Sequence, residues 1–198
     1  MKENRIRYFR ASRWLIRVIF VPLVFLGCAS VSIESVKDPS FESVKDPSFS
    51  NPIHRLFIVV NNGQVDTVDP AYTRYLVAAL KDEFTRKGVD IEIRATGRLA
   101  LNDNVDLAEI ASYKPDGVLT IIASGGVVGP HGGMVKILYD VSLFDAGKNK
   151  RIWRARLDAS GGTGVQEKRM KMMAQGLVKR LSEDHMISSE PRSTGQKI

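Results

Sequence analysis

The sequence is poor in the side chains that many enzymes and metalloproteins use. Its 198 residues include one cysteine and three histidines. The lone cysteine, Cys28, cannot form an internal disulfide. His54, His131 and His185 lack the short spacing that brings two histidines to one metal ion. No serine lies in a Gly-x-Ser-x-Gly or Ser-x-x-Lys context. We therefore expect no metal, no cofactor and no catalytic activity.

The chain also lacks an apolar run of about 20 residues, the length that a membrane-spanning helix needs. A shorter run covers residues 18–26 and follows a start that carries six Lys or Arg side chains. This order is typical of a secretory signal peptide, which we assign to residues 1–27. Those residues contribute +5 of the formal net charge of +7. The remaining chain has no basic arm, so we expect no nucleic-acid partner.

The apolar run ends in Phe25-Leu26-Gly27-Cys28. This ending resembles the lipobox of bacterial lipoproteins, in which the cysteine is acylated and the leader is cut before it. The resemblance implies that Cys28 becomes a lipidated first residue and that the protein faces the periplasm from the outer membrane. Each buried acyl methylene contributes about 0.8 kcal/mol, so several chains hold firmly. The alternatives are an ordinary signal peptide with an unused thiol, or a signal anchor in the inner membrane.

A tandem octapeptide follows the leader. The sequence Glu-Ser-Val-Lys-Asp-Pro-Ser-Phe occupies residues 34–41 and again residues 42–49. Two copies are too few for a solenoid, and Asp-Pro and Pro-Ser favour turns and extended backbone. We expect residues 28–51 to be a lipidated cysteine and a flexible spacer. The alternative is a partner-binding motif with Phe41 and Phe49 as anchors.

Residues 52–183 show the patterns of one folded domain. Apolar runs and period-two alternation predict five strands, at residues 56–60, 89–93, 117–123, 135–143 and 153–159. Helical spacing and capping residues predict three helices, at residues 70–87, 103–113 and 163–181. We expect an α/β (α+β) single domain whose mixed five-stranded sheet has helices packed on it and its first three strands parallel. Residues 184–198 are polar, and we expect a disordered tail.

Part of this domain is similar to a known segment. Asp140-Val-Ser-Leu-Phe-Asp-Ala146 runs into Arg151-Ile-Trp-Arg-Ala155, and an amphipathic helix follows. This pattern resembles the strand-turn-strand segment common in small bacterial envelope lipoproteins. They include uncharacterised lipoprotein families and, more distantly, curli-export and penicillin-binding-protein-activating lipoproteins. The similarity covers about residues 117–181 and implies a small α/β domain in the cell envelope.

A glycine-rich stretch at residues 124–133 is the candidate site. Its candidate residues are Gly125, Gly126, Gly129, His131 and Gly132. Backbone amides of such a loop can cradle a phosphate, but no Gly-Lys-Ser/Thr is present and a strand, not a helix, follows. It is either a mobile connection or a partner-contact loop with His131 at its tip.

These patterns predict a lipid-anchored, non-catalytic binding or assembly module in the periplasm. We expect it to touch the membrane through its N-terminal lipid, and to bind an envelope protein or to self-associate. The alternative function is that of an envelope hydrolase, with a site built from the glycine-rich stretch and His131.

Overall fold

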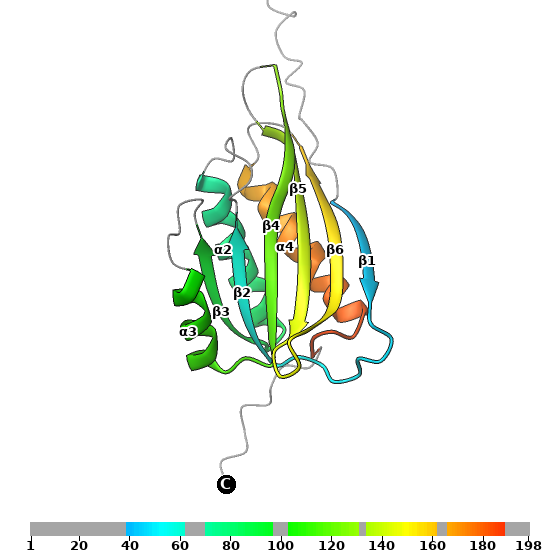
Figure 1. Cartoon of the computed structure of the whole chain (residues 1–198). Coiled ribbons are helices and arrows are strands. Elements are labelled where there is room, and N and C mark those ends of the chain that lie inside the picture. The colour runs from blue at the N-terminus through cyan, green and yellow to red at the C-terminus, as the bar shows by residue number, and fades with distance from the viewer. Residues whose placement is uncertain (1–38, 62–69, 97–102, 131–133, 162–165, 189–198) are drawn as a thin grey trace, which may run out of the picture. The chain divides into compact units, whose positions relative to one another are not determined.

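The computed structural model describes residues 39–61, 70–96, 103–130, 134–161 and 166–188. These residues form a six-stranded mixed sheet and three helices (Figure 1). The strands are β1 (Ser40–Lys45), β2 (Arg55–Asn61), β3 (Asp90–Thr96), β4 (Gly117–Val128), β5 (Met134–Asp145) and β6 (Lys150–Ser160). The helices are α2 (Pro70–Arg86), α3 (Asp103–Tyr113) and α4 (Gln166–Glu183). The expected α/β domain with a mixed sheet is confirmed, but the sheet has six strands rather than five.

The strands lie in the order β1-β6-β5-β4-β2-β3. β2 is parallel to β3 on one side and to β4 on the other, as expected for strands connected through helices. In this parallel set Ile58 lies opposite both Ile93 and Leu119. β4, β5, β6 and β1 continue the sheet with antiparallel neighbours.

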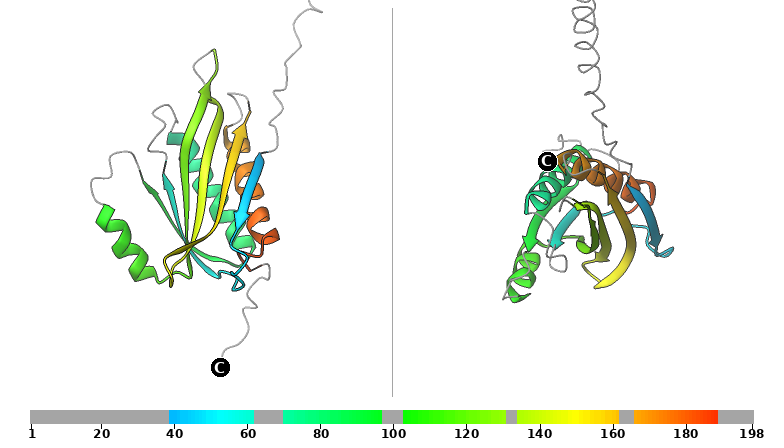
Figure 2. Two further views of the ribbon diagram at one scale, coloured as in Figure 1. Left: turned by 45° about the vertical axis from the view of Figure 1, so that its right-hand side comes forward. Right: turned by 90° about the horizontal axis from the view of Figure 1, so that it is seen from above.

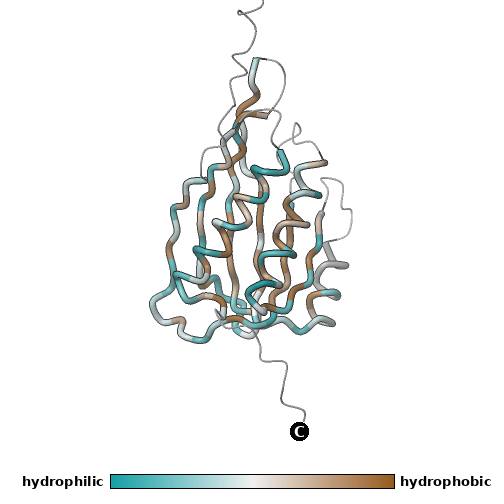
Figure 3. The backbone as a smooth tube through the Cα atoms, turned by 180° about the vertical axis from the view of Figure 1, so that it is seen from behind, coloured by the Kyte–Doolittle hydropathy of each residue, from teal (hydrophilic) through white to brown (hydrophobic). Residues whose placement is uncertain are grey.

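α2 and α4 pack side by side on one face of the sheet (Figure 2). Apolar and polar residues alternate along the strands (Figure 3), so that one side chain in two points to these helices. The helix residues predicted to be core are buried as expected: Met170, Met173, Ala174, Leu177 and Leu181. Burial of one such large apolar side chain contributes roughly 1.5–3 kcal/mol. The hydrophobic core therefore lies between the sheet and these two helices.

α3 packs on the opposite face of the sheet, near the β2 and β3 side. The Phe57 ring meets the Tyr113 ring edge-on at a centroid distance of 6.0 Å. The guanidinium of Arg55 lies 4.2 Å from the centre of the same Tyr113 ring. Arg94 of β3 pairs with Glu109 of α3. β2 is therefore covered on both faces, which agrees with its continuous apolar run.

β1 is the strand that the sequence analysis did not predict. Residues 40–45 fall within the expected flexible spacer, yet they pair with β6 along their whole length. Phe41 and Phe49, one from each copy of the octapeptide, both pack against the core. The spacer interpretation is therefore wrong for these residues, which belong to the domain.

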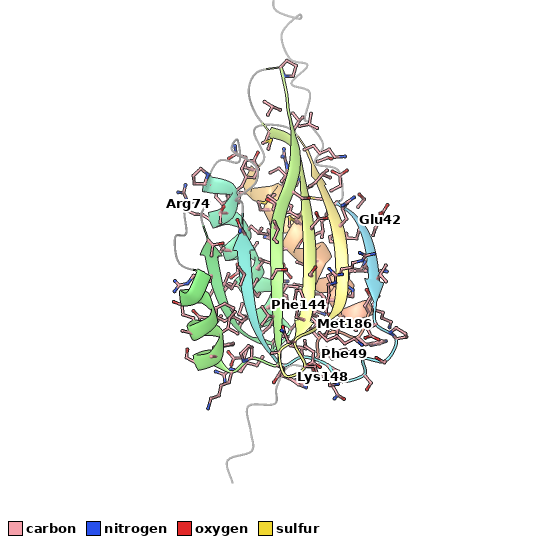
Figure 4. The ribbon with its side chains drawn as sticks, viewed as in Figure 1. Glu42, Phe49, Arg74, Phe144, Lys148 and Met186 are labelled. Carbon is pink, nitrogen blue, oxygen red and sulfur yellow. The ribbon has the colours of Figure 1, made fainter. Side chains whose placement is uncertain are left out.

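The disordered tail expected from residue 184 also begins too early in the sequence. Met186 and Ile187 are only 1% and 2% exposed, and Ile187 forms a bridge with Ile53. Figure 4 shows Met186 and Phe49 at the same end of the sheet. Residues 184–188 therefore belong to the folded domain, and the expectation of disorder is wrong for them. Residues 189–198 and the leader lie outside the described residues.

Candidate functional site

The glycine-rich stretch is a strand over its first half. β4 continues to Val128, and Gly125 and Gly126 lie opposite Leu138 and Ile137 of β5. A bulge at Ser124 shifts the register between Ala123 and Gly125. The expectation of a loop from residue 124 is therefore wrong, because β4 and β5 pair as far as Val128 and Met134.

Gly126 has a packing role in this hairpin. A Cβ atom at Gly126 would lie 2.4 Å from the Cε of Met134 and 3.0 Å from the carbonyl oxygen of Lys136. The missing side chain thus makes room for Met134, which is 4% exposed. Gly129 directly follows β4, whereas His131 and Gly132 lie outside the described residues. The partner-contact loop and the hydrolase site both stay predictions.

A buried arginine packs against the end of the sheet from which the β4–β5 hairpin extends. Arg169 of α4 is 2% exposed and donates hydrogen bonds to the carbonyl oxygens of Met134 (3.1 Å) and Gly161. Its guanidinium also lies 5.7 Å from the centre of the Tyr72 ring. A buried charge is tolerated where hydrogen bonds compensate for its lost hydration. Nearby, burial raises the pKa of Tyr139, whose hydroxyl contacts the sulfur of Met170 at 3.9 Å. We assign this cluster to the packing of α4 on the sheet.

The face of the sheet opposite α2 and α4 is a candidate binding surface. In the described part of the chain no helix lies over β4, β5, β6 and β1 on this side (Figures 1 and 2). Strand alternation and register place the following side chains there: Val118, Thr120, Ile122, Val127, Lys136, Leu138, Asp140, Ser142, Arg154, Arg156, Asp158, Glu42 and Val44. We call this surface the open face.

Charged side chains occupy the middle of the open face. Nε of Arg156 lies 3.1 Å from an oxygen of Asp140, and Nζ of Lys136 lies 2.5 Å from an oxygen of Asp158. The side chain of Arg154 makes no hydrogen bond or ion pair with the other residues that the structure describes. It lines a shallow depression of about 310 Å³, together with residues that include Arg156, Asp140 and Glu42. Arg154 is thus a cation available to a ligand.

Apolar side chains flank these charges. Val44 on β1 is 61% exposed, and Ile122 and Val127 on β4 are 37% and 51% exposed. Singly exposed apolar side chains are ordinary on protein surfaces. Here three of them lie on one face of the sheet. The arrangement therefore places an exposed arginine between two apolar margins.

Of the three histidines named from the sequence, the structure describes His54 and His185, and both lie on the surface. Asp116 accepts hydrogen bonds from the backbone N–H groups of His54 and Arg55, at 3.1 and 2.9 Å. His185 is exposed, just after α4. The described residues contain no group of three or more His, Cys, Asp or Glu side chains placed to hold a metal ion. None of their helices is long and apolar enough to cross a membrane.

The sequence predicts only part of the open face. Alternation in residues 153–159 puts Arg154, Arg156 and Asp158 on the side away from Trp153. That pattern marks a polar face. It does not show whether another layer covers the face, and it does not reveal β1, which supplies Glu42 and Val44.

No protein-family model matches this sequence, and no curated relative was found. Similar solved structures include the PelC dodecamer of Paraburkholderia phytofirmans, with 13% identity over 75% of this chain and 99% of that chain and a TM-score of 0.49. Lipoprotein GNA1162 of Neisseria meningitidis has 12% identity over 65% of this chain and 98% of that chain, with a TM-score of 0.44. Protein XCC0632 of Xanthomonas campestris, assigned to DUF330, has 11% identity over 71% and 90% and a TM-score of 0.38. These likenesses are distant and concern the path of the chain alone.

Proposed function

We propose that this chain is a lipid-anchored, non-catalytic protein of the cell envelope that binds a partner protein through its open face. The acyl chains on Cys28 hold it to the outer membrane, and the domain faces the periplasm. The observation that carries the binding role is the open face itself. It spans four strands and presents Arg154 between apolar margins.

The chemistry of the open face indicates what the partner offers. A guanidinium binds a carboxylate through two parallel hydrogen bonds, which fixes orientation as well as attraction. The partner therefore presents an Asp or Glu to Arg154 and apolar side chains to Val44 and Ile122. Arg156 already pairs with Asp140 at 3.1 Å, so it supports this surface without being the main contact.

The position of β1 fits an anchor at Cys28. Ser40 begins β1, and twelve residue steps separate it from Cys28. An extended chain covers at most about 3.3–3.6 Å per residue, so the start of β1 lies within about 43 Å of Cys28. Because β1 pairs with β6 over all six residues, the segment that follows Cys28 leads directly into the sheet.

A photocrosslinking experiment tests the binding role. A photoreactive amino acid replaces Ile122 on the open face or, as the control, Tyr75 on α2, because the two side chains are equally exposed at 37% and 36%. In intact cells we expect a discrete crosslinked product from position 122 and none from position 75. Arg154→Glu should abolish that product, whereas Arg74→Glu, on exposed α2 surface, should leave it unchanged.

The proposal fails if both positions crosslink alike, or if Arg154→Glu and Arg74→Glu have the same effect. The anchor is tested separately by replacing residues 1–28 with a conventional cleavable leader. That chain should leave the membrane fraction with its circular dichroism unchanged. Retention in the membrane after a high-salt wash would show that a protein surface, and not the acyl chains, is the anchor.

A further inference from the structure

β1 lies in a binding site of its own, formed by the edge of β6 and the C-terminal half of α4. We call this site the β6–α4 edge. Phe41 lies directly on Gly176 of α4, where a Cβ atom would come within 2.4 Å of the Phe41 ring. Ser43 donates a hydrogen bond to Asp184 (3.0 Å) and accepts one from Arg180 (2.8 Å). These contacts recognise the side chains of β1 as well as its backbone.

The contacts continue beyond the end of β1. The backbone N–H of Asp46 donates to the carbonyl oxygen of Ile152 at 2.8 Å. The Asp46 carboxylate pairs with Lys150 at 2.5 Å and accepts hydrogen bonds from the N–H and the hydroxyl of Ser48, at 2.9 and 2.7 Å. Phe49 then packs against the core. Recognition therefore extends from residue 40 to residue 49.

The tandem octapeptide supplies a second segment with nearly the same side chains. Counting back eight residues, Ser32 stands for Ser40 and residues 34–41 repeat residues 42–49 without a change. The one difference in these ten residues is Ile33, which stands for Phe41. We propose that the β6–α4 edge binds either copy of the octapeptide, so that its strand has two registers eight residues apart.

The exchange of Phe41 for Ile33 suits the site. Isoleucine is favoured in strands. A hollow of about 480 Å³ beside Phe41, lined by residues that include Met172 and Gln175, leaves room for a side chain of another shape. The other contacts of residues 42–49 would be made by identical side chains.

The second register enlarges one loop. In the structure, residues 50–52 connect Phe49 to Ile53, whereas in the second register residues 42–52 would make that connection. The probability that a flexible loop closes falls with the three-halves power of its length. The shorter loop alone therefore favours the observed register by about sevenfold. The second register is therefore a minor state in equilibrium with the observed register.

The consequence concerns the tether and rests on the proposed lipid anchor at Cys28. From Cys28 to the first strand residue there are twelve steps in the observed register and four in the second, which begins at Ser32. At no more than about 3.6 Å per residue the maximum reach falls from about 43 Å to about 14 Å. The two copies thus set two distances between the domain and the membrane.

Disulfide trapping in the full chain tests the registers. Val44 lies opposite Arg154 on the open face, and Cβ atoms of directly opposed residues are about 4.5–5.5 Å apart. Val44→Cys with Arg154→Cys traps the observed register. Val36→Cys with Arg154→Cys traps the second register. Lys37→Cys with Arg154→Cys is the matched control, because it has nearly the same tether but lies opposite residue 154 in neither register.

Under a mild oxidant in intact cells we expect a disulfide-linked monomer from the Val44 pair and a slower, smaller yield from the Val36 pair, well above the Lys37 pair. Equal yields from the Val36 and Lys37 pairs would overturn the two registers. Disulfide-linked dimers alone would also overturn them, in favour of strand exchange between molecules. Failure of the Val44 pair would refute the pairing of β1 itself. Arg154→Cys alone reports on Cys28: crosslinking there means a free thiol and counts against the anchor, not the registers.

A deletion gives a second readout. Removing either copy of the octapeptide yields the same sequence, in which Ile33 takes the place of Phe41. We expect this single-copy chain to melt within about 2–4 °C of Phe41→Ile, because the two strands then have the same side chains. A single-copy chain that melts far below Phe41→Ile would show that the copies are not equivalent at the β6–α4 edge.

Discussion

Asp184 is the residue whose removal should most clearly loosen the domain. One of its carboxylate oxygens accepts a hydrogen bond from Nε1 of Trp153 at 2.7 Å and another from the Ser43 hydroxyl at 3.0 Å. The same oxygen lies 3.3 Å from Nε of Arg180. Asp184 therefore ties β1, β6 and the end of α4 together, although the sequence placed it in a disordered tail.

The expected cost of Asp184→Ala follows from these contacts. Trp153 is 1% exposed, so truncation of Asp184 leaves a buried N–H donor without its acceptor. Such a loss costs roughly 1–3 kcal/mol, and more where the acceptor is charged. With the Ser43 contact also lost we expect about 3 kcal/mol, a large part of a typical domain stability of about 5–15 kcal/mol.

Thermal unfolding of the purified chain, followed by circular dichroism, measures this effect. A loss of about 3 kcal/mol corresponds to a fall in Tm of roughly 6–12 °C in a chain of this size. Asp184→Asn keeps an acceptor for Trp153 and should lose less. Glu183→Ala is the control, because Glu183 is 50% exposed and makes only surface ion pairs. If Asp184→Ala melts together with Glu183→Ala, the assigned role of Asp184 is wrong.

Two further predictions concern the hairpin and the end of β1. Gly126→Ala should lower the free energy of unfolding by about 1–3 kcal/mol, because its Cβ would meet the carbonyl oxygen of Lys136 at 3.0 Å and displace the end of the buried Met134 side chain. Gly147→Ala meets nothing closer than 3.5 Å and should be neutral in the same urea titration. Equal midpoints would refute that packing. The ion pair with Lys150 and the hydrogen bonds from Ser48 hold the pKa of Asp46 below its usual value. This stabilisation is complete above the ordinary Asp pKa of about 4 and is lost as pH falls through the lower folded-state pKa. Unfolding curves of the wild type and Asp46→Asn should therefore differ at pH 7 and converge in acid; a constant difference at every pH would contradict it.

The sequence predicts the helices and five of the six strands because their apolar positions form continuous runs or recur with a clear period. β1 lacks this signal. Its side chains toward α4 are Phe41, Ser43 and Lys45, and two of the three are polar. Ser43 is satisfied by Asp184 and Arg180, which are distant in the sequence. A strand held by such contacts cannot be read from its own residues, and the Asp-Pro pairs beside it favour a loop.

The candidate site shows the same limit. Glycine is disfavoured in strands, so Gly125 and Gly126 indicate a loop until the packing of Met134 against Gly126 is known. The polar side of β6 is evident from Arg154 and Arg156. Whether that side meets solvent depends on where α2, α3 and α4 pack, which is decided by the whole fold.

The central claim, that the protein is a lipid-anchored envelope protein, is tested most directly by the intact mass of the mature chain from a bacterial membrane fraction. We predict a chain that begins at Cys28 and carries added mass equal to a diacylglycerol group, with or without a further acyl chain. Its N-terminal peptide should bear that mass on Cys28. A chain that still contains Met1, or one cut near residue 28 with an unmodified cysteine, would contradict the account.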